Sequence, residues 1–309
     1  MNAKVKKIVG TSLVIGGLIS LGALSLLKKQ LEIPVIGITQ IVEHPSLDEE
    51  RQGIIEALAE EGFIDGQNIK IIYKNAQGNM ATAAQIASSL AGQKPAVLVG
   101  ISTPSAQSLL RIAQKHGIPL VFSAVTDPVG SQIISSLNTR SENITGVSDH
   151  MSLESQLELL QQIIPNLKKI GVIFNPGETN SQKMVAELRL AATQKGIQIL
   201  EASIQKTTDV KQAVTQLVGN VQAIYLPNDN AAASAASSIV QIAKKHSLPV
   251  FSSDTGSVQM GVIAARAYNR SVLGNLAGQQ IAQILKGAQA KLIPISIHGQ
   301  LETWINLKA

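Results

Sequence analysis

The chain has 309 residues, of which 45% are hydrophobic and none is cysteine, so it can form two well-packed domains but no disulfide, thiolate nucleophile or cysteine metal site. Its formal net charge is +5, but five of its 26 basic residues are lysines in the first 30 residues, where there is no acid. The other 21 face 21 acidic residues, so the composition shows no electrostatic footprint for nucleic acid.

Residues 8–27 form an uncharged apolar run flanked by these lysines. As a helix, this run spans about 30 Å, the hydrocarbon thickness of a bilayer. We expect residues 1–30 to be a membrane anchor. A signal peptide cleaved near Ala23-Leu24-Ser25 is the alternative, and a buried core helix is a third possibility. Either of the first two places the folded part outside the cytoplasm if the basic terminus stays inside.

From residue 33 onward, short apolar strands alternate with amphipathic helices, which is typical of parallel sheets covered by helices on both faces. The strands predicted in the first half are 33–39, 69–73, 96–101 and 119–125. Those predicted in the second half are 169–174, 198–203, 222–226 and 248–252. We expect Thr103 to be the N-cap of a helix that begins at Pro104 and ends near His116. An apolar stripe from Leu153 predicts another helix that stops at Pro165.

The segment IAQKHGIPLVFS at 112–123 returns as IAKKHSLPVFSS at 242–253, which indicates two similar halves. The predicted fold class is therefore α/β, with two doubly wound parallel-sheet lobes joined by a three-crossing hinge. Lobe 1 is expected to contain 31–145 plus 254–290, and lobe 2 to contain 146–253 plus 291–309. In this scheme the strand and helix after residue 253 return to the first lobe, and strands at 293–297 and 303–307 close the second.

Polar residues follow most of the predicted strands, where open α/β sheets bind their ligands. The candidates for ligand binding are Glu43, His44, Ser102, Thr103, Ser105, Thr126, Asp127, Asn180, Asn228, Asp229 and Asp254. Helix N-termini attract anions, while Asp229 and Asp254 would attract an ammonium group, so a zwitterion fits both. The alternative is that these residues are ordinary helix caps. Glu43 and His44 are poor caps, which favours a site.

No catalytic motif is visible: there is no phosphate-binding glycine loop, no dinucleotide fingerprint, no zinc-protease motif and no nucleophile elbow. His44 is a poor general base because no nucleophile and orienting group accompany it. We therefore predict no catalytic residue, no metal site and no cofactor. A function as an enzyme that acts on a small polar substrate remains an alternative.

The segments QIVEHPSLD, NAQGN, TDPVG and NITG are similar to those of a known family. From residue 33 to the end the chain resembles ABC-transporter substrate-binding proteins of the tryptophan/tyrosine-binding kind, which have the type I periplasmic binding fold. The resemblance implies that Ser102, Thr103 and Ser105 hold a ligand carboxylate, with Thr126 and Asp127 nearby. It implies that the opposite lobe and the hinge contribute Asn180, Asn228, Asp229 and Asp254, with an acid on the α-amino group. Glu43 and His44 would border the side-chain pocket.

The resemblance implies a function as well as a fold. The chain would capture an amino acid, with aromatic ones among the candidates, or a similar small solute by hinge closure and deliver it to an ABC permease. The alternative is a ligand-sensing module of a membrane signalling system. Family members are commonly tethered through a lipid-modified cysteine; without one, this chain would use residues 8–27 as its anchor or signal.

Overall fold

The computed structural model describes residues 33–138, 142–297 and 300–308. The chain divides into two compact units, residues 1–34 and 35–309, and the fold described below is that of the second. The expected N-terminal helix at 8–27 and its alternatives lie outside the described residues. Within the described ranges, no helix combines the length and the apolar character needed to cross a bilayer.

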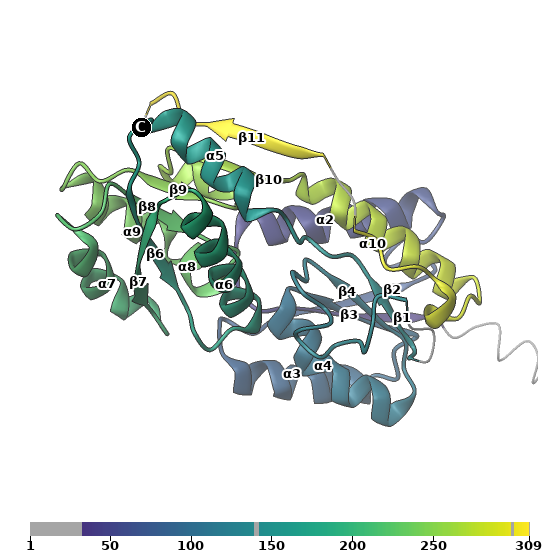
Figure 1. Ribbon diagram of the computed structural model, residues 1–309. Coiled ribbons are helices and arrows are strands. Elements are labelled where there is room, and N and C mark those ends of the chain that lie inside the picture. Colours follow the sequence, from purple (N-terminus) through teal and green to yellow (C-terminus); the bar gives the residue numbers. More distant parts are fainter. Residues whose placement is uncertain (1–32, 139–141, 298–299, 309) are drawn as a thin grey trace, which may run out of the picture. The chain divides into compact units, whose positions relative to one another are not determined.

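Lobe 1 contains a five-stranded parallel sheet in the order β2-β1-β3-β4-β5. The strands are β1 (Val35–Gln40), β2 (Lys70–Asn75), β3 (Val97–Ile101), β4 (Leu120–Ser123) and β5 (Ile144–Gly146). The helices on one face are α3 (Met80–Gly92) and α4 (Thr103–His116), and those on the other are α2 (Pro45–Glu60) and α10 (Arg270–Leu285) (Figure 1). The sheet is buried between these two layers, which explains why its central strands are continuous apolar runs.

Helices α2 and α10 pack very closely because glycines lie between them. A Cβ atom added at Gly274 would collide with the carbonyl oxygen of Glu50, and one at Gly278 would lie 2.6 Å from that of Ile54. Leu273 and Ile281 of α10 are fully buried in the same cluster as Ile54 and the β1 side chains. The late helix α10 is therefore an integral part of lobe 1.

Lobe 2 contains a six-stranded sheet in the order β11-β10-β9-β8-β6-β7, in which only β11 runs antiparallel to its neighbour. The strands are β6 (Lys169–Phe174), β7 (Gln198–Ser203), β8 (Ala223–Leu226), β9 (Val250–Ser252), β10 (Ala264–Tyr268) and β11 (Leu301–Ile305). The helices are α5 (Leu153–Ile163), α6 (Thr179–Gln194), α7 (Val210–Leu217), α8 (Asn230–Ser234) and α9 (Ala236–Lys244). Side chains of α5 and α6 pack on one face, and those of α7 and α9 pack on the other.

The chain crosses between the lobes three times: after β5, at Asn269 between β10 and α10, and between η3 (Ala290–Leu292) and β11. The two-lobed α/β fold is confirmed. The expected return of residues 254–290 to lobe 1 begins later, because β10 pairs with β9 in the second sheet and only α10 packs on lobe 1. The expected strand at 293–297 does not close lobe 2. Its Ser296 instead forms a bridge with Val147 of lobe 1.

The repeated segment folds in the same way in both lobes. Each copy contains the last turn of a helix and then a strand, α4 to β4 in one lobe and α9 to β9 in the other. Gly117 and Ser247 occupy equivalent places with φ of 65° and 51°, and in each copy the next residue donates its N–H back to an alanine carbonyl at 3.0 Å. This left-handed ending is a common way to stop a helix. The duplication is therefore visible in the backbone as well as in the sequence.

Candidate ligand-binding site

Two adjacent cavities lie between the carboxyl ends of the strands of the two lobes. The inner cavity has a volume of about 40 Å³, and the outer cavity about 570 Å³; both are lined by Val42 and Asn230. The sequence candidates that line the inner cavity are His44, Ser102, Thr103, Thr126, Asn180, Asn228, Asp229 and Asp254. Glu43 lines the outer cavity, whereas Ser105 and Asp127 line neither. Loops far apart in the sequence thus meet at one place.

The start of α4 forms one wall of the inner cavity, and its side chains lack partners. The hydroxyl groups of Ser102, Thr103 and Ser105 are buried without any hydrogen-bond partner. Ser102, not Thr103 as expected, holds the N-cap position, and it makes no capping bond. Its φ of 82° and ψ of 158° fall in a region that is essentially restricted to glycine. Unpaired hydroxyls and a strained backbone at a helix N-terminus are characteristic of a binding site for an anion.

Two asparagines of lobe 2 contribute unpaired acceptors to the opposite wall. Asn180 donates its Nδ2 to the carbonyl oxygen of Asn228 at 2.8 Å, and Asn228 donates its own Nδ2 to Asp149 at 3.1 Å. These bonds fix the orientation of both amides, so that each Oδ1 is left buried without a partner. A ligand that donates hydrogen bonds, such as an ammonium group, would satisfy both oxygens.

Asp229 is held by donors of its own lobe. It is the N-cap of α8, accepting a hydrogen bond from the N–H of Ala232 at 2.6 Å, and its other oxygen accepts from the Ser181 hydroxyl at 2.6 Å. Burial, followed by the charge of Glu178, raises the pKa of Asp229 to about 7. The side chain lines the cavity, but much of its hydrogen-bonding capacity is used in folding.

His44, in the loop after β1 of lobe 1, lies close to Asp254, in the loop after β9 of lobe 2. His44 does act as a cap, since its Nδ1 accepts from the N–H of Ser46 at the start of α2. Its Nε2 lies 3.5 Å from Asp254, which itself caps η2 (Thr255–Met260) through Ser257. Burial alone would raise the pKa of Asp254, but the charges of His44 and Arg270 hold that pKa below its usual value.

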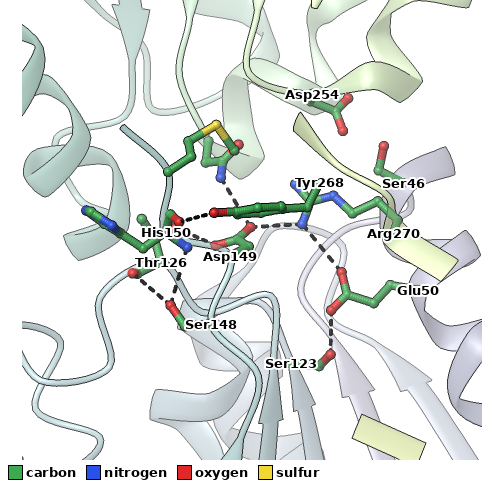
Figure 2. A network of polar contacts seen from close by, with 12 residues as sticks. Ser46, Glu50, Ser123, Thr126, Ser148, Asp149, His150, Asp254, Tyr268 and Arg270 are labelled. Carbon is green, nitrogen blue, oxygen red and sulfur yellow. Dashed lines mark hydrogen bonds and ion pairs between the residues drawn. The ribbon is translucent and has the colours of Figure 1, made fainter. Parts of the chain in front are cut away.

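Sequence reasoning missed the buried ion-pair network centred on Arg270 (Figure 2). Its Nη1 donates to Asp149 at 2.8 Å and to Glu50 at 3.4 Å, and its Nε is buried without a partner. Arg270 and Asp149 both line the inner cavity. Burial raises the pKa of Glu50 to about 7 despite the nearby Arg270 charge and a hydrogen bond from the Ser123 hydroxyl. One signal was present: an arginine in the first turn of a helix opposes the helix dipole unless acids surround it.

The remaining candidates Thr126 and Asp127 differ in their surroundings. Thr126 donates to Asp149 at 3.0 Å and so belongs to this network. Asp127 instead accepts from the N–H of Gly130 and lies 3.6 Å from Lys183 of lobe 2. In the described part of the chain, no group of three or more acidic or histidine side chains could hold a metal ion.

A sequence profile of the family described as ABC transporter substrate binding protein matches residues 35–309. The chain belongs to this family. The resemblance drawn from the sequence is thereby confirmed, and so is its interpretation as a solute-binding protein of an ABC transporter. This is a family of solute-binding proteins and not of enzymes, and its members act outside the cytoplasm.

Three relatives of this substrate-binding protein are informative. A tyrosine-binding protein from Clostridioides difficile is 38% identical over 279 residues, 90% of this chain and 79% of its own length. An ABC domain from Streptococcus pneumoniae in complex with L-Trp is 33% identical, with a TM-score of 0.84 over 89% of this chain and 92% of the other. The ligand-free, open structure of a substrate-binding protein with adhesive properties from Clostridium difficile is 36% identical with the same coverage of both chains, but its TM-score is 0.66. At similar identity, residues 35–309 superpose better on the complex than on the open structure.

Proposed function

We propose that this substrate-binding protein captures a free amino acid with an aromatic side chain, such as tyrosine or tryptophan, and delivers it to an ABC permease. The observation that carries the proposal is the set of buried, unpaired polar atoms on the two walls of the inner cavity. Lobe 1 contributes hydroxyl groups at the start of α4, and lobe 2 contributes the amide oxygens of Asn180 and Asn228. Leaving such atoms unpaired costs about 1–3 kcal/mol each, so a ligand that pairs them binds favourably.

The polarity of the two walls orients the ligand. The hydroxyls of Ser102 and Thr103, beside the positive end of the helix dipole, suit the α-carboxylate. The oxygens of Asn180 and Asn228 can only accept hydrogen bonds, so they suit the α-ammonium. Because Asp229 and Asp254 are engaged as caps, they act on the site through the loops that they hold, and Asp254, whose pKa is lowered, adds its negative charge.

The outer cavity suits an aromatic ring that has a polar edge. Its lobe 1 wall includes Ile41, Val42, Met80 and Pro104, on which a flat ring can pack. Its lobe 2 wall contains amide, hydroxyl and ammonium groups of loop residues such as Asn175 and Lys206. A phenol or an indole presents an apolar face and a hydrogen-bonding edge, and the relatives named for tyrosine and L-Trp bind such side chains.

Calorimetry on the purified full chain tests this proposal with L-tyrosine, L-tryptophan and L-phenylalanine. We expect binding of the first two and weaker binding of L-phenylalanine, which lacks a polar edge. Thr103→Val removes one cavity hydroxyl without changing the shape of the side chain, and it should weaken binding roughly tenfold or more. The matched control is Thr193→Val, on the exposed surface of α6, where the hydroxyl bonds to the helix backbone. If none of the three amino acids binds, the proposed ligand is wrong.

We further propose that residues 8–27 attach the protein to the membrane, with cleavage as a signal peptide as the alternative. The sequence supports this through an apolar run of membrane-spanning length between lysine clusters. A reporter fused after Ala309 that works only outside the cytoplasm should be active, and fractionation should leave the chain with the membrane. Activity of a reporter that works only in the cytoplasm would contradict this topology.

A further inference from the structure

The first two crossings between the lobes are joined by a buried ion pair. Asp149 lies just after β5 on the first crossing, and Arg270 begins α10 at the second. The Arg270 Nη1 donates to Asp149 at 2.8 Å, and the two side chains are 5% and 4% exposed (Figure 2). Because water is excluded, this pair is far less screened by solvent and salt than a surface ion pair. This ion pair thus holds the two hinge segments together, and both of its residues line the inner cavity.

Asp149 also contacts both lobes directly. One carboxylate oxygen accepts from the Thr126 hydroxyl of lobe 1 at 3.0 Å. The other, which already accepts from Arg270, also accepts from Nδ2 of Asn228 in lobe 2 at 3.1 Å. The bond from Asn228 joins this hinge residue to lobe 2, so Asp149 links the hinge directly to both lobes.

Asn228 has two polar ends, and its amide orientation decides what each can do. With Nδ2 toward Asp149, the Oδ1 is the buried, unpaired acceptor of the inner cavity. If the amide were turned over, its oxygen would face the Asp149 carboxylate and its NH₂ would face the ligand ammonium, and both contacts would be repulsive. An ammonium group at Oδ1 and a carboxylate at Nδ2 therefore favour the same orientation.

We propose that Asn228 couples ligand binding to hinge closure, by accepting a hydrogen bond from the ligand ammonium while donating one to Asp149 of the Arg270–Asp149 ion pair. Asn228 is then a binding residue, and Asp149 and Arg270 are positioning residues that act through it. Since a ligand shifts a conformational equilibrium only through its different affinity for the two states, this bond would be one source of that difference. The inference rests on the proposed function for the identity of the ammonium group.

An exchange of the two side chains tests the coupling. Asn228→Asp places a carboxylate beside Asp149 with little change of shape, so repulsion should open the lobes. Adding Asp149→Asn restores one amide and one carboxylate in contact, and the double variant should close again. The matched control is Asn220→Asp in lobe 2, where the asparagine is exposed, follows α7 and bonds to the backbone of that helix.

The distance between the lobes is the readout, measured by fluorescence energy transfer on the full chain. Because the chain has no cysteine, dyes can be attached after Lys115→Cys in lobe 1 and Lys211→Cys in lobe 2, both at exposed positions. Without ligand, Asn228→Asp should lower the closed fraction, and Asp149→Asn in the same chain should restore most of it. With L-tyrosine, Asn228→Asp should weaken binding at least tenfold, and the double variant should recover at least half of that loss on a logarithmic scale. Lobes of Asn228→Asp that close as in the unaltered chain would overturn the coupling.

A ligand without an ammonium group isolates the role of that charge. The compound 3-(4-hydroxyphenyl)propionate keeps the carboxylate and the phenol of L-tyrosine, and it should bind to the unaltered protein without closing it. Closure as complete as with L-tyrosine would show that the coupling does not run through the ammonium. If L-tyrosine and L-tryptophan fail to bind at all, the proposed ligand is wrong, while the ligand-free distances still decide whether Asn228 and Asp149 hold the lobes together.

Discussion

Replacing Ser102 with glycine should stabilise the folded protein and weaken ligand binding. Its backbone, with φ of 82° and ψ of 158°, costs about 1–3 kcal/mol for any residue other than glycine. Ser102→Gly removes this strain, but the glycine gains freedom in the unfolded chain, which offsets about 0.5–1 kcal/mol. We therefore expect the free energy of unfolding to rise by up to about 2.5 kcal/mol, or the Tm to rise by up to about 5–10 °C.

The same substitution should weaken ligand binding. The buried Ser102 hydroxyl has no protein partner, and in the proposed function it donates to the ligand carboxylate. A hydrogen bond to a charged group contributes about 1.5–3 kcal/mol, so its loss should weaken affinity roughly 10-fold to 150-fold. Stability and affinity should thus change in opposite directions in a single variant.

Urea unfolding monitored by circular dichroism and calorimetry with L-tyrosine measure the two effects separately. Ser102→Ala is the control, because alanine keeps the strained backbone and loses only the hydroxyl. It should bind as weakly as Ser102→Gly without the gain in stability. If Ser102→Gly unfolds at the same or lower urea concentration than Ser102→Ala, the strain argument is refuted. If both bind L-tyrosine normally, the hydroxyl does not contact the ligand.

Three further predictions concern the interior and the contact between the lobes. The pKa of Glu50 is raised from 4.5 to about 7 in the folded protein, so between these pH values the folded protein binds more protons than the unfolded chain. The contribution of Glu50 to the free energy of unfolding therefore falls by on the order of 3 kcal/mol as the pH rises from 4.5 to 7. Urea unfolding at pH 5 and pH 8 should show a smaller pH dependence for Glu50→Gln than for the unaltered protein. Gly274→Ala should lower the free energy of unfolding by about 1–3 kcal/mol because its Cβ would collide with α2, whereas Gly92→Ala, in open space, should change it by less than about 1 kcal/mol. Thr179→Val removes hydrogen bonds from lobe 2 to Gln107 and Ser131 of lobe 1, so calorimetry should show affinity for L-tyrosine a few-fold weaker with little change in Tm.

Each of these outcomes has a contrary result. An unchanged pH dependence in Glu50→Gln would show that this carboxyl titrates normally. Equal stability of the two glycine variants would show that the α2–α10 contact yields easily. Unchanged affinity in Thr179→Val would show that its hydroxyl does not hold the lobes together.

The sequence was sufficient for most of the fold because the signals involved are local. Apolar runs bounded by turn residues located nine of the eleven strands in the described residues, among them β6 and β7 at their observed bounds, and a strand was also expected where β10 lies. The sequence was insufficient for the place of β10: the strand expected after residue 253 was assigned to lobe 1, whereas β10 pairs with β9 and β11 in lobe 2. No local pattern indicates which of two sheets such a strand joins.

The candidate site was predictable as a set of loops but not as chemistry. Position after a strand predicted that Ser102, Asn228 and Asp229 lie together, and all three line the inner cavity, because parallel strands end at one edge of the sheet. The position of a residue in the sequence does not show that Asp229 is engaged as a helix cap while the Asn228 Oδ1 has no partner, because both depend on hydrogen bonds formed in the folded structure. The ion pair of Asp149 and Arg270 joins residues more than a hundred positions apart, and no local pattern links them.

The close packing of α10 on α2 also sets the order in which the molecule can be completed. Helix α2 is made early, but its buried face is covered by α10, which begins only at Arg270. Lobe 2 lacks only its edge strand when β10 has emerged, whereas lobe 1 then still lacks α10, one of the two helices on that face of its sheet. Contacts over such a long sequence separation form slowly, because the intervening chain must be closed into a loop. The half of the protein that is synthesised first is therefore the half that finishes folding last.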